Sequence, residues 1–203
     1  MSGLGGAVAR LHGLLSDAAC QDVVDAAERS QTWAAQLDTV DRRPEWQHTI
    51  YDGSMFLDKD LVPLVEELAH TAIIPALSTA LGLDAHSLEL SWAFVRAYAS
   101  DRRHSFPVHR DRSVATANIL LTHPSMFEGA ELFALGDRWA GAEQWSEKEF
   151  RRNLPERVLR EAPHKVDYDQ GDCVMHLGKQ LHGVLPLASG HRHVLILMFE
   201  KKP

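Results

Sequence analysis

The hydrophobic pattern of this chain changes its period at Gly82, and this change most constrains what the chain can fold into. Before Gly82, apolar residues recur at helical spacing over 16–30, where Ser16 is a suitable N-cap, and again over about 60–81. Pro75 should kink the second helix or split it in two, because proline cannot donate a helix backbone hydrogen bond. The first part of the chain is therefore predicted to be mainly helical.

Short strands separated by turns follow Gly82. Alternation predicts a first strand over 88–98, and one of its faces is expected to carry Leu88, Leu90, Trp92, Phe94, Arg96 and Tyr98. Further strands are predicted at about 114–121, 131–135, 164–168, 172–176, 182–186 and 192–200, with turns at 169–171 and at Ser189-Gly190. Helices followed by many short strands predict an α+β fold: a double-stranded β-helix (jelly-roll) barrel with the N-terminal helices packed on one sheet.

The length of 203 residues fits a single domain. We expect 1–87 to be mainly helical support and 88–200 to form the jelly-roll core. The charged, helix-prone segment Gly136–Pro163 interrupts the strands and is predicted to be a helical insertion. Because loops on a rigid scaffold commonly carry specificity, this insertion and the loop Ser100–Pro107 are expected to flank the mouth of a site. The loop is basic, and it is either a lid or an exposed segment.

Composition narrows the function classes. A formal charge of −7 argues against a mainly electrostatic nucleic-acid binder. The longest uninterrupted apolar run, Val194–Phe199, is far shorter than the roughly 20 residues that cross a bilayer, so no membrane contact is expected. Cys20 and Cys173 are too few for a disulfide framework, and Met1–Ala9 lacks the pattern of a secretory signal. These features predict a cytoplasmic protein with reduced thiols.

The chain holds 12 histidines, which raises the expectation of metal chemistry. His109 and Asp111 stand at i and i+2, so they project from the same side of an extended segment. With His182 they could occupy one face of an octahedral ion, which is the two-histidine, one-carboxylate arrangement of non-haem iron(II) oxygenases. Arg192 begins the most apolar strand, where a cation is costly unless an anion meets it. That anion is either a dicarboxylate ligand or an acidic residue at the sheet edge.

The segment Ser91–Glu200 resembles the iron(II)/2-oxoglutarate-dependent dioxygenases of the prolyl 4-hydroxylase and lysyl hydroxylase group. Residues 109–118 look most like the lysyl hydroxylase pattern His-x-Asp-x-Ser-x-x-Thr-x-Asn. Residues 128–133 are similar to the group's Glu-Gly-Gly-x-x-Phe, with Ala130 in place of the second glycine. The end of the chain resembles the end of these enzymes at Gly171-Asp172, Met175-His176, His182 and Gly190-x-Arg192.

The resemblance implies roles for particular residues. His109, Asp111 and His182 would be the iron ligands, and Arg192 would bind the distal carboxylate of 2-oxoglutarate. Two further cosubstrate contacts are implied for Tyr98, which could equally be a core tyrosine, and for Asn118, whose amide needs a ligand or a neighbouring strand. The candidate substrate-pocket residues are Arg96, Thr116 and His176. Plain alternation from Asp111 would turn Asn118 outward, so a turn or bulge near 112–114 is required.

The implied activity is hydroxylation of an unactivated C–H bond with Fe(II), 2-oxoglutarate as cosubstrate and O2, releasing succinate and CO2. Ascorbate is an optional further cofactor. The expected partner is a small-molecule or peptide substrate, foremost a prolyl- or lysyl-like side chain, with a small natural product as the alternative. No nucleic acid or membrane partner is expected, and the oligomeric state is left open.

The same residues allow other interpretations. His191-x-His193 could seed a cupin-type metal site, but if Arg192 points into the barrel, both histidines point away. A nucleic-acid demethylase of the superfamily would have a second arginine where this chain has Met198, and a halogenase would lack the carboxylate of Asp111. A cupin-type or other binding protein without this chemistry is the remaining alternative.

Overall fold

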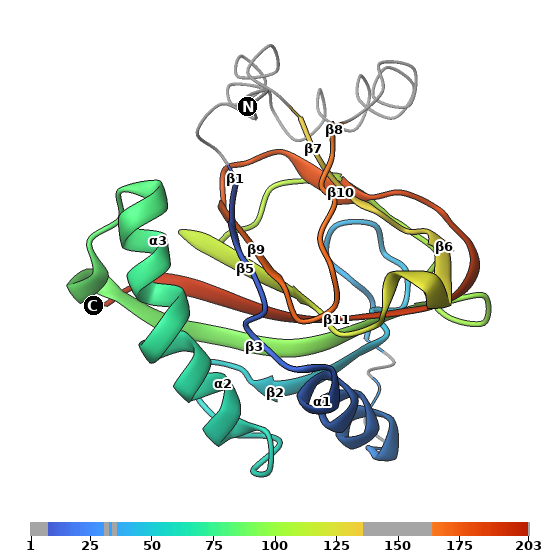
Figure 1. The fold of residues 1–203 in the computed structure, drawn as a ribbon, viewed down its shortest axis with the longest axis horizontal. Coiled ribbons are helices and arrows are strands. Elements are labelled where there is room, and N and C mark those ends of the chain that lie inside the picture. Colours follow the sequence, from blue (N-terminus) through green and yellow to red (C-terminus); the bar gives the residue numbers. More distant parts are fainter. Residues whose placement is uncertain (1–7, 31–32, 34–35, 136–163, 203) are drawn as a thin grey trace.

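The computed structural model describes residues 8–30, 33, 36–135 and 164–202, and these form two antiparallel sheets with helices on one side (Figure 1). The strands of the larger sheet are β1 (Val8–Leu11), β2 (Gln47–Tyr51), β3 (Leu88–Ala99), β5 (Ala115–Leu120), β6 (Phe127–Gly129), β9 (Cys173–Leu177) and β11 (Leu187–Lys201). Their order is β1-β9-β5-β11-β3-β2, and β6 pairs with the first part of β11. The smaller sheet, in the order β4-β10-β7-β8, contains β4 (Phe106–His109), β7 (Leu132–Ala134), β8 (His164–Lys165) and β10 (His182–Val184).

The first helix, α1 (Asp17–Arg29), begins and ends close to where the spacing predicts it. Ser16 is the N-cap, and its hydroxyl accepts a hydrogen bond from the backbone NH of Ala19. The stripe Cys20, Val23 and Ala27 is buried in the core between the helices and the larger sheet. The helix is thus held by an apolar face at helical spacing, as the sequence indicates.

The second helical stretch is continuous but irregular. It consists of α2 (Val62–Leu68), a π-helical turn (Ala69–Ile73) and α3 (Ile74–Leu81), and it ends at Gly82 with φ +69°. The π turn ends two residues before Pro75, whose missing NH and ring disturb the regular hydrogen-bond ladder. By length and composition alone Val62–Leu81 could cross a membrane. In this fold, however, Val65, Ile73 and Leu77 are fully buried against the larger sheet.

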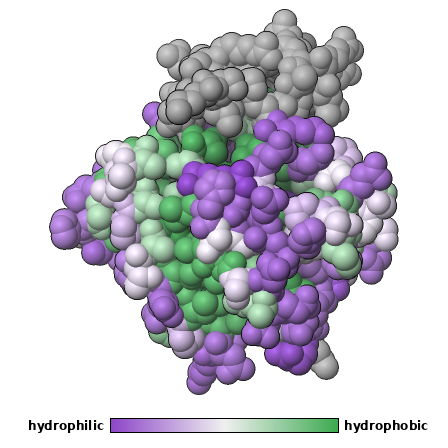
Figure 2. All heavy atoms as spheres, in the orientation of Figure 1, coloured by the Kyte–Doolittle hydropathy of each residue, from purple (hydrophilic) through white to green (hydrophobic). Residues whose placement is uncertain are grey.

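Two cores lie on opposite faces of the larger sheet. One is shared with α1 and the α2–α3 stretch, and the other lies inside the barrel, between the two sheets. In Figure 2 charged and polar residues gather along the margins of the face shown, and apolar residues occupy much of its middle. The fold is therefore the α+β arrangement expected from the sequence: a double-stranded β-helix with helices packed on one sheet.

Strand β3 does not keep a single face along its whole length, and here the sequence expectation is wrong. Leu90 pairs with Phe199 and Trp92 with Met198, so Ser91 is an extra residue in β3. This bulge sends Leu88 and Leu90 to the helix-side core, whereas Phe94, Arg96 and Tyr98 stay on the barrel side. A period-two pattern cannot reveal such a shift, because both faces of this strand carry apolar residues.

The chain bends between β4 and β5 as the parity argument requires. Residues 112–114 form a bend that carries the chain from the smaller sheet to the larger one. After it, the even-numbered Thr116 and Asn118 lie on the barrel side, while Ala115, Ala117 and Ile119 belong to the helix-side core. The bend thus allows Asp111 and Asn118 to belong to the same barrel interior despite their different parity.

Two other predicted features differ from the structure, and a third is not tested by it. Ser189-Gly190 is not a turn between strands but part of β11, at the position where its partner changes from β6 to β3. Gly190 has φ +79°, and a Cβ there would lie 2.1 Å from the carbonyl oxygen of Met126, so only glycine fits. Strand β8 is shorter than predicted. The predicted insertion Gly136–Pro163 lies outside the described residues.

Four short strands, β1, β2, β4 and β6, are not predicted from the sequence. Strands β1 and β2 come from the part of the chain expected to be helical support, and they form the two edges of the larger sheet. Arg10 in β1 donates hydrogen bonds to Asp172, which directly precedes β9, and to the carbonyl oxygen of Asp167 at 2.8 Å. Contacts with distant parts of the chain, rather than the local sequence pattern, make these segments strands.

Candidate metal centre

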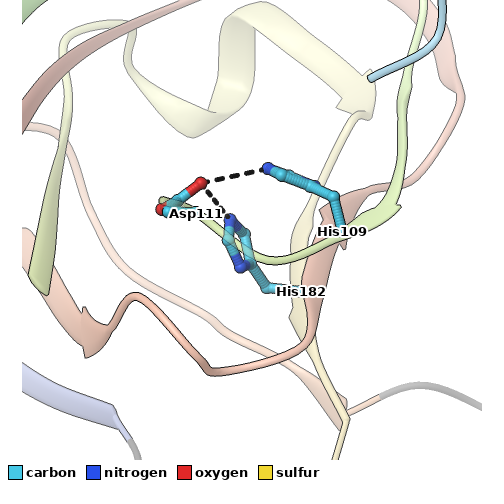
Figure 3. A group of neighbouring side chains, drawn as sticks. All are labelled: His109, Asp111 and His182. Carbon is cyan, nitrogen blue, oxygen red and sulfur yellow. Dashed lines mark ion pairs between the residues drawn. The ribbon is translucent and has the colours of Figure 1, made fainter. Parts of the chain in front are cut away.

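The three predicted metal ligands meet inside the barrel (Figure 3). His109 ends β4 and His182 begins β10, and these two residues are directly paired across the smaller sheet. Asp111 follows on the bend toward β5. Its Oδ1 lies 3.3 Å from Nε2 of His109 and 3.7 Å from Nε2 of His182, and one ligand atom from each residue lies within 4.8 Å of the other two. The strand pairing therefore brings together residues that are far apart in the sequence.

Both histidines present the same ring nitrogen to this cluster. Nδ1 of His109 donates to the carbonyl oxygen of Pro107, and Nδ1 of His182 donates to that of Gln180, each at 2.9 Å. A carbonyl oxygen can only accept, so the proton is on Nδ1 and the lone pair is on Nε2, which faces Asp111. Burial lowers the pKa of His182 well below its usual value, so this imidazole is neutral and able to bind a metal.

The two oxygens of the Asp111 carboxylate have different neighbours. Oδ1 faces the histidines, whereas Oδ2 accepts a 2.5 Å hydrogen bond from the hydroxyl of Thr116. Ser113 in turn donates to Thr116 at 2.9 Å. Burial raises the pKa of Asp111, but the imidazoles of His182 and His109 lower it by more because they take up a proton before the carboxylate does, so the carboxylate stays ionised. Thr116 in β5 thus holds the carboxylate in place, and Ser113 on the bend holds Thr116.

A third imidazole packs beside the cluster. His176 in β9 is buried, its ring centroid lies 4.2 Å from that of His182, and its Nε2 is 4.0 Å from Oδ2 of Asp111. Its Nδ1 donates to the carbonyl oxygen of Leu177, so Nε2 can accept from the amide of Asn118 at 3.3 Å. Asn118 therefore finds a partner on the neighbouring strand. Both residues belong to the lysyl hydroxylase-like pattern: Thr116 forms a hydrogen bond with Asp111, and Asn118 forms one with His176.

Gly178 is a residue that the sequence analysis missed. Its carbonyl oxygen accepts from the NH of Asp111, and its NH donates to the carbonyl oxygen of Val114. A Cβ at this position would lie 1.7 Å from the carbonyl oxygen of Ser113. The backbone of the segment between β9 and β10 therefore presses directly against the bend that carries the carboxylate. The signal available was only a glycine between two histidines.

Arg192 lies deep in the barrel, with 2% of its surface exposed. It is paired across the sheet with Tyr98, whose ring centroid lies 5.5 Å from the guanidinium. Its Nη2 donates to the hydroxyl of Tyr168 at 2.7 Å. Within the described part of the chain, no carboxylate forms an ion pair with it. The acidic partner at the sheet edge is thus not found among these residues, and Tyr168 is a neighbour that the sequence did not single out.

The remaining candidates take varied positions. Arg96, a candidate pocket residue, is buried on the barrel side and donates to Asp38 at 3.2 Å and to Gln47 at 2.9 Å. Whether it contacts a substrate stays a prediction. His193 points away from the barrel and bonds to Glu28 of α1 at 2.8 Å, as alternation around Arg192 implies.

In the basic loop Ser100–Pro107, both arginines are tied to carboxylates from other parts of the chain, while Asp101 and His104 are exposed. Arg102 makes two hydrogen bonds to Glu28, at 2.6 and 2.8 Å. Arg103 is almost fully buried and pairs with Asp41 at 2.9 Å. Both arginines are thus ion-paired, and the end of the loop becomes the first part of β4. Whether the loop acts as a lid stays a prediction.

Solved structures with the same architecture identify the fold. An oxidoreductase of the 2OG-Fe(II) oxygenase family from Burkholderia pseudomallei has a TM-score of 0.62 and 11% identity, over 97% of this chain and 85% of that one. A prolyl-4-hydroxylase from Pseudomonas putida has a TM-score of 0.60 and 16% identity, over 97% and 94% of the two chains. The non-haem, α-ketoglutarate-dependent carbocyclase SnoK of nogalamycin biosynthesis has a TM-score of 0.67 and 14% identity, over 95% and 79%.

Comparison of the sequence alone finds no relative: no protein-family model matches the chain, and no curated protein matches it either. The structural similarity nevertheless extends over almost the whole chain and includes both sheets. The chain therefore has the double-stranded β-helix fold of the 2OG-Fe(II) oxygenases.

Proposed function

We propose that this protein is an iron(II)- and 2-oxoglutarate-dependent dioxygenase that hydroxylates an unactivated C–H bond. The observation that carries the proposal is the cluster of His109, Asp111 and His182, whose ligand atoms lie within 4.8 Å of one another in the barrel. Arg192, a buried guanidinium in the same barrel, supports the choice of a dicarboxylate cosubstrate.

The donor set fits Fe(II). Two neutral imidazole nitrogens and one carboxylate oxygen form the facial set that leaves positions open for other ligands. Both imidazoles are fixed by hydrogen bonds from Nδ1 to backbone carbonyls, and the carboxylate is fixed by Thr116. Such outer contacts orient metal ligands in general. The donor set itself therefore needs no rearrangement of hydrogen bonds to accept a metal.

The chain's own residues have distinct tasks in this proposal. Bound iron, with 2-oxoglutarate and O2, supplies oxidative decarboxylation to succinate and CO2 together with transfer of one oxygen atom to a C–H bond. His109, Asp111 and His182 hold the metal, and Arg192 orients the cosubstrate through its distal carboxylate. The apolar lining, which includes Phe94, Phe106 and Val194, excludes water from the reacting centre.

For the substrate, we propose an amino-acid side chain, prolyl- or lysyl-like, free or within a peptide. The support is the pattern in residues 109–118, together with the similarity of the fold to a prolyl-4-hydroxylase. A small natural product is the second candidate, supported by the similarity to SnoK. Both candidates need the same metal centre, and they differ only in what reaches it.

The test is a substrate panel analysed by mass spectrometry. The protein is loaded anaerobically with Fe(II) and 2-oxoglutarate, given prolyl and lysyl peptides, free amino acids or small polycyclic compounds, and then exposed to O2. We expect one panel member to gain one oxygen atom while succinate forms in equal amount. Asp111→Ala should form neither product. If the wild-type protein forms no iron-dependent succinate with any member, or if Asp111→Ala matches it, the proposal is wrong.

A further inference from the structure

His109 is carried by a weakly supported strand. β4 has four residues and lies at the edge of the smaller sheet, and within the described part of the chain it pairs only with β10. Of its four residues only Phe106 is buried. The ring of His109 donates its hydrogen bond to Pro107 in the same strand, so this bond fixes the tautomer but not the place of the strand. The contacts of Phe106 therefore decide where His109 lies.

The ring of Phe106 connects two buried guanidiniums with the metal ligand. The Cζ atoms of Arg103 and Arg96 lie 4.5 and 4.7 Å from its centroid. An aromatic ring attracts a cation, and the attraction is stronger away from water. The same ring meets that of His109 at an interplanar angle of 79°, with centroids 4.5 Å apart. Nε2 of this imidazole in turn faces Asp111 (Figure 3).

Both guanidiniums are fixed by carboxylates of one distant segment. Asp41 accepts two hydrogen bonds from Arg103, at 2.9 and 3.1 Å, and Asp38 accepts one from Arg96 at 3.2 Å. The segment closes on itself, because the NH of Asp38 donates to the carbonyl oxygen of Arg43. A pair of parallel hydrogen bonds sets the plane of a guanidinium as well as its position. The place of Phe106 thus depends on residues more than 60 positions earlier in the chain.

We propose that Asp41, Arg103 and Phe106 position His109 for metal binding. Asp41 holds the guanidinium, the guanidinium holds the ring of Phe106, and that ring holds the imidazole. This inference rests on the proposed function, and it adds positioning residues that lie outside the ligand set. Contacts that orient a metal ligand raise metal affinity without touching the ion.

The neighbouring arginine of the same loop provides a matched control. Arg102 makes two hydrogen bonds to Glu28, at 2.6 and 2.8 Å, but its guanidinium packs on Trp33 and Trp46, at 4.8 and 5.4 Å, rather than on Phe106. Asp41→Asn and Glu28→Gln each turn a carboxylate into an amide of the same shape, and each leaves an arginine without its anion. Only the first change interrupts the path to His109.

The experiment measures binding of Co(II), a divalent probe for sites with nitrogen and oxygen ligands. The full chain is used as wild type, Asp41→Asn, Phe106→Leu, Glu28→Gln and Asp111→Ala. Calorimetry gives the affinity, and the visible absorption of bound Co(II) reports the number and geometry of its ligands. The melting temperature without metal measures stability separately. Phe106→Leu keeps an apolar side chain and removes the ring, so it tests the same path without leaving a buried charge unpaired.

We expect Asp41→Asn and Phe106→Leu each to weaken Co(II) binding about 10-fold and to change its absorption spectrum, because losing an outer contact of a metal ligand costs about 10- to 100-fold in affinity. Glu28→Gln should keep the wild-type affinity and spectrum even where its melting temperature is lower. A purely structural role of Asp41 and Phe106 predicts lower melting temperatures with an unchanged spectrum.

Three outcomes overturn the inference, and they are distinguishable. Wild-type affinity and spectrum in Asp41→Asn or in Phe106→Leu means that the path does not position His109, while the metal centre itself stands. Equal weakening by Glu28→Gln means that metal affinity follows overall stability rather than this path. If the wild type binds no Co(II), or if Asp111→Ala binds it equally well, the proposed function fails and the inference fails with it.

Discussion

At the scale of single residues, Arg192 is the most demanding feature of the barrel. It is a charge almost completely removed from water, held by one phenol and surrounded by aromatic rings. Such a group is stable only if something compensates the cost of its burial. The proposed cosubstrate does so, and this makes Arg192 the residue whose replacement is most informative.

We expect Arg192→Met to weaken 2-oxoglutarate binding by about two to three orders of magnitude, because breaking a buried ion pair costs about 3–5 kcal/mol. The affinity of Arg192→Lys for 2-oxoglutarate should lie between those of the wild type and Arg192→Met, since lysine keeps the charge but loses the paired geometry of the guanidinium. Affinity and melting temperature are to be measured on the same three proteins. If the three proteins bind 2-oxoglutarate equally well and the variants have a lower melting temperature, Arg192 has a structural role instead.

Gly178 tests whether the metal site depends on close backbone packing. A Cβ there would overlap the carbonyl oxygen of Ser113, so Gly178→Ala must displace the bend that carries Asp111. We expect metal affinity to fall about 10- to 100-fold although all three ligands are present. Gly82→Ala is the control: it strains a left-handed position with open space around it, which costs about 1–2 kcal/mol of stability and leaves metal affinity unchanged. Equal metal affinity in Gly178→Ala would show that the bend can move without consequence.

At the scale of elements, the edge strand β1 is held by its backbone pairing with β9 and by one buried carboxylate. Asp172 is buried, and its oxygens accept hydrogen bonds from the Arg10 side chain and from the NH groups of Gly13 and Asp169. Burial raises the pKa of Asp172, but these hydrogen bonds lower it by more, so the folded value lies below the usual one. The carboxylate therefore stabilises the folded state only while it is ionised.

We expect Asp172→Asn to lower the free energy of unfolding by about 1–3 kcal/mol at pH 7. Because the pKa is lower in the folded state, this contribution is complete above the unfolded pKa of about 3.9 and is lost as the pH falls through the folded value. The difference between the two proteins should thus shrink on acidification in urea titrations. Asp169→Asn is the control. The Asp169 side chain is exposed, and its carboxylate lies 3.6 Å from Arg10, which is too far for a strong hydrogen bond, so the free energy of unfolding should change little. A pH-independent difference would contradict the assignment.

Elements that carry a strong period of their own could be predicted from the sequence. The helices α1 and α2–α3, with Ser16 and Gly82 at their ends, follow from spacing and capping. The bulge at Ser91 and the change of partner at Gly190 could not be predicted, because each depends on which strands lie on either side. The same is true of β1, whose four residues become a strand only against β9.

At the scale of the whole molecule, the site follows from topology. His109 and His182 are neighbours because β4 and β10 pair, and Asp111 reaches them because the chain bends between the two sheets. That these three side chains meet could be predicted because the residues around them resemble the patterns of a known enzyme group, whereas a His-x-Asp triplet alone is common in a chain with 12 histidines. Tyr168 and Gly178 could not, since a tyrosine and a glycine in this part of the chain look like core and turn residues until their contacts are known.

The central claim is tested most directly by whether 2-oxoglutarate binding depends on iron at this one site. Calorimetric titrations of 2-oxoglutarate are made anaerobically with and without Fe(II), on the wild type, Asp111→Ala and the double variant His191→Ala/His193→Ala. We predict one ion and one 2-oxoglutarate per wild-type chain, with cosubstrate binding much weaker without iron. Asp111→Ala should lose the iron-dependent binding, and the double variant should keep it. Iron-independent affinity, or loss in the double variant and not in Asp111→Ala, would contradict the account.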